Sequence, residues 1–274
     1  MESALLLMSL LGAGAIAGLS AGLFGVGGGF VVVPALLLVI GAFGQSSAQD
    51  VHLAIGTSLA TIVVTSLRAL HAHSHRGAVD FKVLRDWAPW LVVGALGGVA
   101  LAAAAGAKTL LLVFALGVLC YAIYFLRPDF MLRRERHYSF PQGAGRAALA
   151  SGLAGFSALL GIGGGTPFVV TMVVCGRSVH QAVATAAGVG CLIALPGALG
   201  FLVLGWAQPG LPSGSVGYIN VPAFAAIAAM SVITAPVGAR WAHSLSEVHL
   251  RRAFGAYLLL VAFSMFSKFL AAQG

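Results

Sequence analysis

The sequence contains two glycine clusters whose backbone groups could bind a ligand. The first reads Gly-Val-Gly-Gly-Gly at 25–29, and the second reads Gly-Ile-Gly-Gly-Gly at 161–165. Each lies within a long apolar run, where a glycine costs a helix about 1 kcal/mol relative to alanine, so each cluster should break a helix. A helix that restarts after such a break has free N–H groups and a positive dipole end, which together attract anions. The clusters therefore predict an anion site built from backbone groups, although glycines that only permit tight helix packing are the alternative.

Hydroxyl side chains add candidate ligands to the two clusters. Thr57 and Thr185 hold the same place in two matching segments, VHLAIGTS at 51–58 and VHQAVATA at 179–186. Their hydroxyls could donate to an oxyanion, or they could bond to a carbonyl of their own helix or of a neighbouring helix. The predicted substrate-binding set is Gly25, Gly27, Gly28, Gly29, Thr57, Ser58, Gly161, Gly163, Gly164, Gly165, Thr166 and Thr185.

Histidines offer two further chemistries. His52 and His180 match across the same two segments and are candidates for carrying a coupled proton, with a polar anchor at a helix start as the alternative. His71, His73 and His75 have spacing that could suit a metal, but they stand among basic residues, which favours an interfacial charge cluster. We therefore expect no metal, no cofactor and no catalytic residue.

Composition places these residues in a membrane. The chain has 274 residues, of which 59% are hydrophobic and only 8% are charged, against roughly 25% charged in an ordinary soluble domain. Several uncharged runs reach the length of about 20 residues that a membrane-spanning helix needs. The strict alternation of a barrel strand is missing from these runs, so the sequence predicts an all-α polytopic membrane protein.

The apolar segments that must position the glycines form two similar sets. GAVD at 77–80 aligns with GYIN at 217–220, in the same order relative to the glycine clusters and the threonine segments. Asp80 and Asn220 share a position in this repeat, where both residue types are good helix N-caps. The predicted organisation is an N-terminal repeat at 1–126, a basic linker at 127–146 and a C-terminal repeat at 147–274. The ten segments are expected at about 3–24, 30–43, 51–70, 87–104, 109–126, 147–160, 166–175, 179–206, 219–239 and 253–269.

Basic residues predict how the segments are oriented. The formal net charge is +8, and most Lys and Arg fall in the loops 71–86, 127–146 and 240–252. Such loops are cytoplasmic by the positive-inside rule. This distribution explains the positive net charge without nucleic-acid binding. Loops 44–50 and 207–217 should then face outward, and equivalent segments run in opposite directions. The sequence therefore predicts two inverted-topology repeats, each with a broken or re-entrant helix pair and three transmembrane helices.

The chain resembles the TauE/SafE, or sulfite exporter, family of membrane proteins. The residues that carry the resemblance are 18–29 with Pro34, HLAIGTSL at 52–59, RGAVD at 76–80 and the second glycine cluster at 161–165. The resemblance implies export of small sulfur-containing anions, such as sulfite, sulfoacetate and other sulfonates, across a bacterial cytoplasmic membrane. It covers nearly the whole chain.

These observations together predict a secondary transporter, and specifically an exporter. It would move a small organosulfur or sulfur oxyanion by alternating access, with the anion at the paired glycine-rich half-helix N-termini. The glycines lack a following Lys-Ser/Thr pair, so an ion gradient or the membrane potential is the expected energy source. An anion channel and a membrane-embedded enzyme are the alternatives. The expected partners are the anionic substrate and the lipid bilayer of the inner membrane, and homo-oligomerisation is left open.

Overall fold

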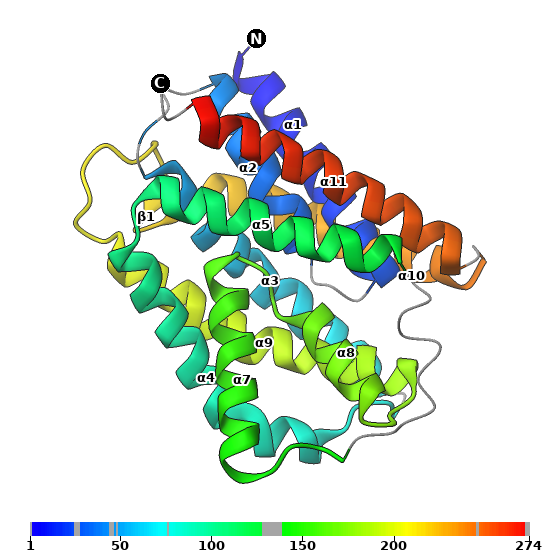
Figure 1. Ribbon diagram of the computed structural model, residues 1–274. Helices are drawn as coiled ribbons and strands as arrows, with labels where there is room; N and C mark the ends of the chain where they lie inside the picture. The colour runs from blue at the N-terminus through cyan, green and yellow to red at the C-terminus, as the bar shows by residue number, and fades with distance from the viewer. Residues whose placement is uncertain are drawn as a thin grey trace.

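Helices form along the apolar runs in the computed structural model of the protein, which describes residues 2–24, 28–43, 47, 49–75, 77–127, 139–244 and 247–271 (Figure 1). The helices of the first half are α1 (Glu2–Phe24), α2 (Gly29–Phe43), α3 (Asp50–Ser74), α4 (Phe81–Ala104) and α5 (Ala107–Leu126). Those of the second half are α7 (Gly143–Leu159), α8 (Gly165–Val174), α9 (Val179–Leu204), α10 (Val221–Ser244) and α11 (Glu247–Ala271). A short antiparallel hairpin, β1 (Ser215–Val216) and β2 (Ile219–Asn220), precedes α10.

Helix length separates the spanning helices from the broken ones. Seven described helices, α1, α3, α4, α5, α9, α10 and α11, are long and apolar enough to cross a membrane. By contrast α2 has 15 residues and α8 has 10, and at 1.5 Å per residue they reach only about 22 Å and 15 Å, less than the roughly 30 Å hydrocarbon core. The prediction of an all-α polytopic membrane protein is confirmed.

Several boundaries differ from those expected, including the start of α11 at Glu247 rather than near residue 253. Helix α4 begins at Phe81 rather than near residue 87, because Asp80 caps it and its first turns carry the charges that end an apolar run. Helix α7 begins at Gly143, inside the range 127–146 expected as a linker. The outward loop expected at 207–217 contains the β1 strand of the hairpin. Hydropathy locates the membrane-embedded part of a helix, whereas caps determine where the helix begins.

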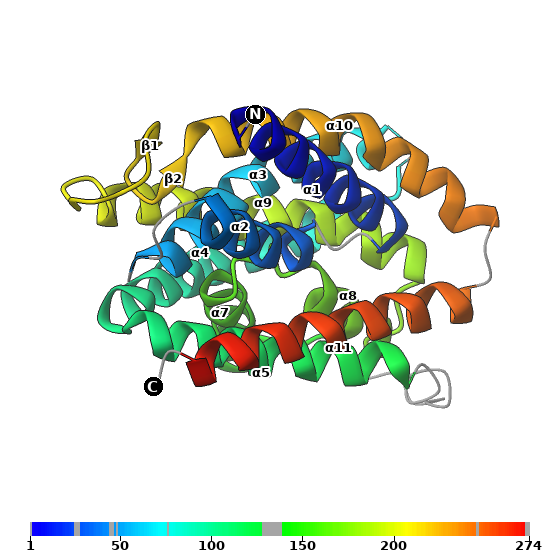
Figure 2. The ribbon, with the colours of Figure 1, turned by 90° about the horizontal axis from the view of Figure 1, so that it is seen from above.

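Helices of the two halves pack against each other in pairs. Helix α1 packs against α10, and α4 packs against α7. The first helix of each half therefore packs against the fourth helix of the other half. The third helices, α3 and α9, form a pair, as do the fifth helices, α5 and α11. Figure 2 shows the α1–α10 and α5–α11 pairs on opposite sides of the molecule, with α2, α3 and α9 between them. These four helix pairs therefore stay the same when the two halves are exchanged.

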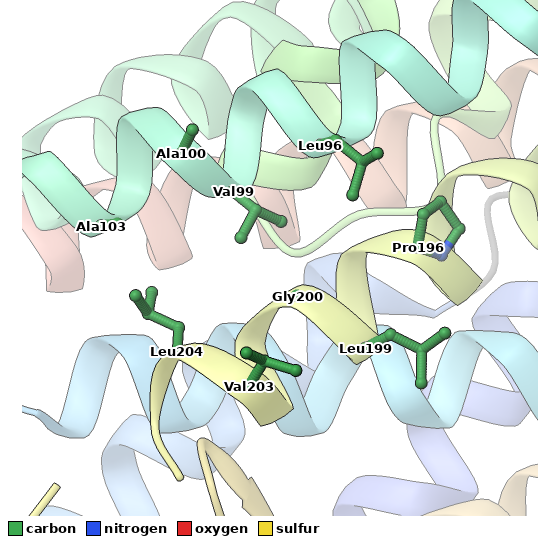
Figure 3. A pocket seen from close by; sticks show the side chains of 9 residues that line it. All are labelled: Leu96, Val99, Ala100, Ala103, Pro196, Leu199, Gly200, Val203 and Leu204. Atoms are coloured by element: carbon green, nitrogen blue, oxygen red, sulfur yellow. The ribbon is translucent and has the colours of Figure 1, made fainter. Parts of the chain in front are cut away.

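A surface groove with a volume of about 510 Å³ lies between α4 and α9 (Figure 3). Its lining is apolar, and the exposed side chains of Leu96, Leu199 and Val203 border it. Such a surface suits hydrocarbon and gives an anion no hydrogen-bond donor, so the candidate site must be sought elsewhere.

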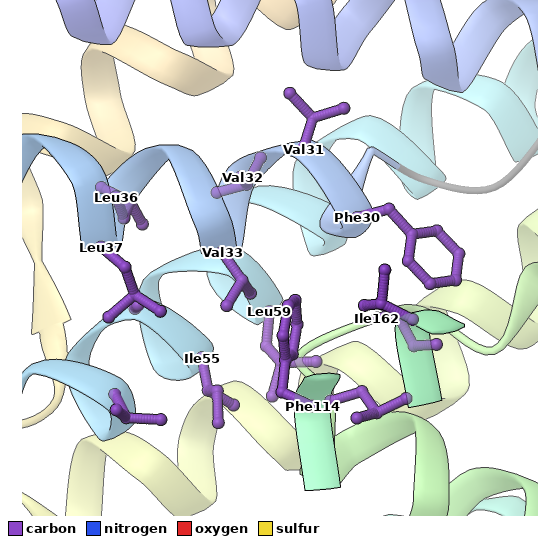
Figure 4. Close-up of a cluster of buried hydrophobic side chains, with 14 of the residues drawn as sticks. Phe30, Val31, Val32, Val33, Leu36, Leu37, Ile55, Leu59, Phe114 and Ile162 are labelled. Carbon is purple, nitrogen blue, oxygen red and sulfur yellow. The ribbon is translucent and has the colours of Figure 1, made fainter. Parts of the chain in front are cut away.

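The larger hydrophobic core encloses the first part of the half-helix α2. Val32 and Val33 have no exposed surface, and Phe30 is 1% exposed. Figure 4 shows these side chains among Ile55 of α3, Phe114 of α5 and their neighbours. Because broken backbone at membrane depth needs protein or water around it, this enclosure is what a half-helix requires.

Glycines on α4 allow it to approach α7 closely. A Cβ on Gly94 would collide with the backbone of Ser151, and a Cβ on Gly98 would collide with the carbonyl oxygen of Gly155. These two glycines are four residues apart, which is the small-residue spacing of tightly packed membrane helices.

We expect Gly98→Ala to destabilise the protein by about 1–3 kcal/mol, because the added methyl group forces two helix backbones apart. The measurement is the thermal unfolding of the purified protein in detergent. Gly97→Ala is the matched control, because a Cβ at Gly97 meets nothing within 4 Å. Equal unfolding temperatures for the two variants would show that this close approach does not stabilise the fold.

Candidate functional site

The two glycine breaks lie in contact with each other. A Cβ on Gly29 would be 2.5 Å from the carbonyl oxygen of Gly161 and 3.0 Å from the Cα of Ile162. Ser58 of α3 donates a hydrogen bond of 2.8 Å to the same Gly161 oxygen. The hydrogen bond from α3 thus holds the second cluster next to the start of α2. Three predicted site residues, Gly29, Ser58 and Gly161, therefore lie close together. Gly25 and Gly27, also predicted, lie outside the described residues.

Both half-helices begin directly after a glycine in the left-handed region. Gly28 has φ +77° and precedes α2, and Gly164 has φ +67° and is the N-cap of α8. The carbonyl oxygen of Gly28 accepts from the N–H of Val31 at 2.9 Å, which starts the first turn. The N–H groups at such a start have no acceptor within the helix. Each glycine cluster is therefore followed by the start of a short helix, which is where the sequence predicts anion-binding N–H groups.

Two buried hydroxyls adjoin the start of α8. Thr166 lies in its first turn and is 5% exposed, and Ser157 lies in the last turn of α7 and has no exposed surface. Neither hydroxyl oxygen has a hydrogen-bond partner within the described part of the chain. A Cβ on Gly164 would be 3.3 Å from Ser157 Oγ, so this hydroxyl lies beside the helix start. Because buried polar groups are nearly always paired, these two hydroxyls make the start of α8 the candidate site.

Sequence reasoning selected Thr166 and missed Ser157. The position matching Ser157 in the first half, counted from the glycine clusters, is Ala21. A search for residues shared by both repeats therefore passes over it. The available signal was a lone polar side chain in the last turn before the second cluster.

The start of α2 has a different character. Phe30 holds the position that matches Thr166, and its ring packs edge-on against Tyr121 at 4.8 Å and Phe254 at 6.3 Å between centroids. The first helix start is thus aromatic and the second is polar. Side-chain donors for an anion concentrate at α8.

Thr57 and Thr185 are fully buried and bond across the two halves. Thr57 Oγ1 accepts from the backbone N–H of Asn220 at 3.0 Å, and Thr185 Oγ1 accepts from the backbone N–H of Asp80 at 2.9 Å. Thr61, one turn after Thr57, donates to the Thr57 carbonyl at 2.9 Å, as a threonine in a membrane helix often does. The oxygens of the two matched threonines therefore hold helix starts in place.

Asp80 and Asn220 are N-caps, as predicted. Asp80 Oδ1 accepts from the N–H of Val83 at 3.1 Å, and Asn220 Oδ1 accepts from the N–H of Ala223 at 3.0 Å. Asp80 also forms an ion pair of 3.0 Å with Arg177, which lies in the turn between α8 and α9.

The two matched histidines lie in different surroundings. His52 is 8% exposed, and its Nε2–H donates to the Ala102 carbonyl at 3.0 Å while its ring stacks on Tyr218 at 5.1 Å. Burial raises the pKa of the Tyr218 phenol above its usual range, so this ring is uncharged at physiological pH. His180 is exposed. The contacts of His52 are those of a polar anchor at a helix start.

We expect His52→Ala to lower the free energy of unfolding by about 2 kcal/mol, through the lost hydrogen bond and the lost ring contact. His180→Ala is the control, and its effect should stay within about 0.5 kcal/mol because the side chain is exposed. Thermal unfolding in detergent measures both. A His52→Ala protein of native stability that no longer responds to a proton gradient would instead make His52 a coupling residue.

The described residues contain no cluster of side chains suited to binding a metal ion. No set of three or more His, Cys, Asp or Glu side chains there could hold an ion. His71 and His75 have their Nε2 atoms 3.2 Å apart at the exposed end of α3.

Comparison with known proteins gives the relationship of the chain. Residues 10–265 match the sulfite exporter TauE/SafE family. A probable membrane transporter protein of Haemophilus influenzae is 31% identical over 259 residues, covering 93% of this chain and 96% of its own length. A probable membrane transporter protein of Methanocaldococcus jannaschii is 26% identical, covering 91% of each chain. No solved structure matches the chain. The protein thus belongs to the sulfite exporter TauE/SafE family and is a multi-pass membrane transporter of that type.

Proposed function

We propose that the transporter carries a small sulfur oxyanion, either sulfite or an organosulfonate such as sulfoacetate, with its charged group at the start of α8. The observation that carries the proposal is the pair of buried hydroxyls of Ser157 and Thr166 beside the left-handed Gly164, neither of which has a hydrogen-bond partner among the described residues. The family match supports the substrate class, because the family is described as sulfite exporters.

The chemistry of the donors fits such an anion. Sulfite and sulfonate groups each present three oxygens that accept hydrogen bonds. The first turn of α8 offers N–H groups and the Thr166 hydroxyl as donors, and Ser157 of α7 offers a second hydroxyl. Hydrogen bonds to a charged acceptor are about twice as strong as neutral ones. The dipole of α8 adds favourable partial charge at the same point. A site of neutral donors binds an anion without fixing it as firmly as a buried cation would, which suits a carrier that must release its substrate.

We further propose that the two halves are inverted repeats that give alternating access. Three features support this: the repeated glycine clusters, the helix pairs that stay the same when the halves are exchanged, and the matched threonine bonds. Inverted repeats with broken helices at their interface are a common design of secondary transporters. The basic loops 71–86, 127–146 and 240–252 support a cytoplasmic location for those segments, and we propose that the protein lies in a bacterial inner membrane and transports its substrate outward.

The experiment is an anion panel in proteoliposomes, with and without a proton gradient. Sulfite, sulfoacetate and a second sulfonate are compared with sulfate, phosphate and chloride. We expect saturable uptake of at least one of the first three, and acceleration by unlabelled anion on the opposite side. Flux that never shows such counterflow would indicate an anion channel, and chemical conversion of the anion by purified protein would indicate an enzyme. Transport confined to the last three anions would contradict the proposed substrate class.

A further inference from the structure

The bonds of Thr57 and Thr185 have a geometry that suggests more than helix packing. We propose that each bond is a latch, meaning a hydrogen bond that holds closed the opening to the binding site on one side of the membrane. We call these two openings the mouths of the transporter, and propose that only one latch opens at a time. This inference rests on the proposed alternating-access function and adds to it the residues that hold each mouth shut. The Thr185–Asp80 bond closes what we call the Asp80 mouth, and the Thr57–Asn220 bond closes the Asn220 mouth.

Each latch joins one half of the chain to the other. The hydroxyl oxygen of a threonine in the third helix of one half accepts from the N–H of the N-cap residue of the fourth helix in the other half. Both threonines have no exposed surface. A hydrophobic replacement would leave the N–H of Asp80 or Asn220 without its partner, so the closed position of that helix start would become less favourable.

The latches lie at opposite ends of the α3–α9 pair. A Cβ on Gly56, next to Thr57, would be 3.0 Å from the Cβ of Phe201, so Thr57 lies level with the C-terminal end of α9. Thr185 lies near the N-terminal end of α9, sixteen residues before Phe201. At 1.5 Å per residue the two latches are about 24 Å apart, most of the thickness of a bilayer core.

The candidate site lies between the two latches. A Cβ on Gly163 would be 3.4 Å from the Cα of Gly190, and a Cβ on Gly164 would collide with the side chain of Ile193. Residues 190 and 193 of α9 lie between the level of Thr185 and the level of Phe201. A closed mouth above and below a binding site is the occluded state that alternating access requires.

Different groups reinforce the two latches. At the Asp80 mouth, the Asp80 carboxylate forms the ion pair with Arg177, whose side chain also lies over the ring of Phe140 at 5.5 Å. At the Asn220 mouth, the Asn220 amide donates to the Ser213 carbonyl and to Ser215 Oγ, at 3.2 Å and 3.1 Å. Each N-cap residue is thus bonded to neighbouring residues as well as to its threonine. We expect the N-cap residue and the helix start that it caps to move together when the threonine bond breaks.

The first test uses the sidedness of substrate affinity. A latch that is weakened on one side favours the state open to that side, and apparent affinity scales with the population of the competent state. Thr185→Val should therefore lower the apparent KM for anion added at the Asp80 mouth relative to the apparent KM at the other mouth, and the ratio of the two should shift by about fivefold, the factor given by one net hydrogen bond. Thr57→Val should do the reverse. Thr61→Val is the matched control, because Thr61 is a buried threonine whose hydroxyl donates to a carbonyl of its own helix, α3.

The second test is amide hydrogen exchange on the full-length protein in nanodiscs, which needs no transported anion. Thr185→Val should speed exchange at residues 80–84 and leave residues 220–224 as in the wild type, and Thr57→Val should give the opposite pattern. Thr185→Ser and Thr57→Ser keep the hydroxyl and should restore the wild-type exchange. If both valine variants loosen both helix starts, or shift KM equally from both sides, the threonines are packing residues and the latch proposal is wrong. If no anion is transported by the wild type, the proposed function fails while the exchange pattern still decides for or against the latches.

Discussion

Gly164→Val should reduce transport to the level of protein-free liposomes. Gly164 has φ +67°, a region that costs a residue with a side chain roughly 1–2 kcal/mol and a β-branched residue more. The new Cβ would also collide with the side chain of Ile193 and lie 3.3 Å from Ser157 Oγ. The start of α8 must therefore move, and with it the N–H groups and the hydroxyl that we propose to hold the anion. Uptake of the anion identified in the proteoliposome panel measures the effect.

Gly77→Val separates this effect from backbone strain. Gly77 has φ +64°, and a Cβ there meets nothing within 4 Å, so the substitution imposes a similar backbone cost away from the site. We expect this variant to lose stability but to keep substantial transport. Full transport by a Gly164→Val protein that is monodisperse in detergent would remove the start of α8 from the mechanism.

Thr166→Val should lower kcat/KM for the transported anion by about 10- to 100-fold. The estimate follows from a hydrogen bond to a charged group, which is worth roughly 1.5–3 kcal/mol, and from the tenfold change that 1.4 kcal/mol represents. Valine has nearly the same shape as threonine, so the change removes the hydroxyl and little else. Thr166→Ser keeps the hydroxyl and should recover most of the transport rate.

Although Thr166→Val should lower transport, it should not lower the stability of the protein without substrate. Thr166 Oγ1 has no partner among the described residues, so the protein without substrate loses no hydrogen bond on its removal and should unfold at the same or a higher temperature. Thr171→Val is the control on the same helix, because Thr171 Oγ1 donates to the Pro167 carbonyl at 2.9 Å and has no part in the site. A loss of transport that is equal in the two variants would point to general damage of α8.

The sequence could predict the helices and the breaks because both follow from local chemistry. Apolar runs must become helices in a bilayer, and glycine clusters must interrupt them, so the short α2 and α8 follow directly from residues 25–29 and 161–165. The N-caps Asp80 and Asn220 were predictable for the same reason. The start of α4 was placed too late, because a helix that begins outside the membrane leaves no signal in an apolar run.

The roles of individual polar residues depended on partners far along the chain. Thr57 and Thr185 were identified as a matched pair, but their acceptor bonds to Asn220 and Asp80 join residues more than a hundred positions apart. Ser157 became significant only when the fold placed it beside Gly164.

The histidines show why matched positions need not share an environment. Tyr218, which stacks on His52, aligns with Ala78 in the other half, so the repeat supplies no matching ring for His180. Matched positions in the two halves therefore need not have matched neighbours.

The position of a bound sulfonate is the most direct measurement of whether the anion is held at the start of α8. A crystal of the wild-type protein grown with 2-bromoethanesulfonate would locate the ligand by the anomalous signal of bromine and the density of the sulfonate group. We predict sulfonate oxygens within hydrogen-bond distance of Ser157 Oγ, Thr166 Oγ1 and the first N–H groups of α8. A sulfonate bound elsewhere, with the two hydroxyls still unpartnered, would contradict the proposed site.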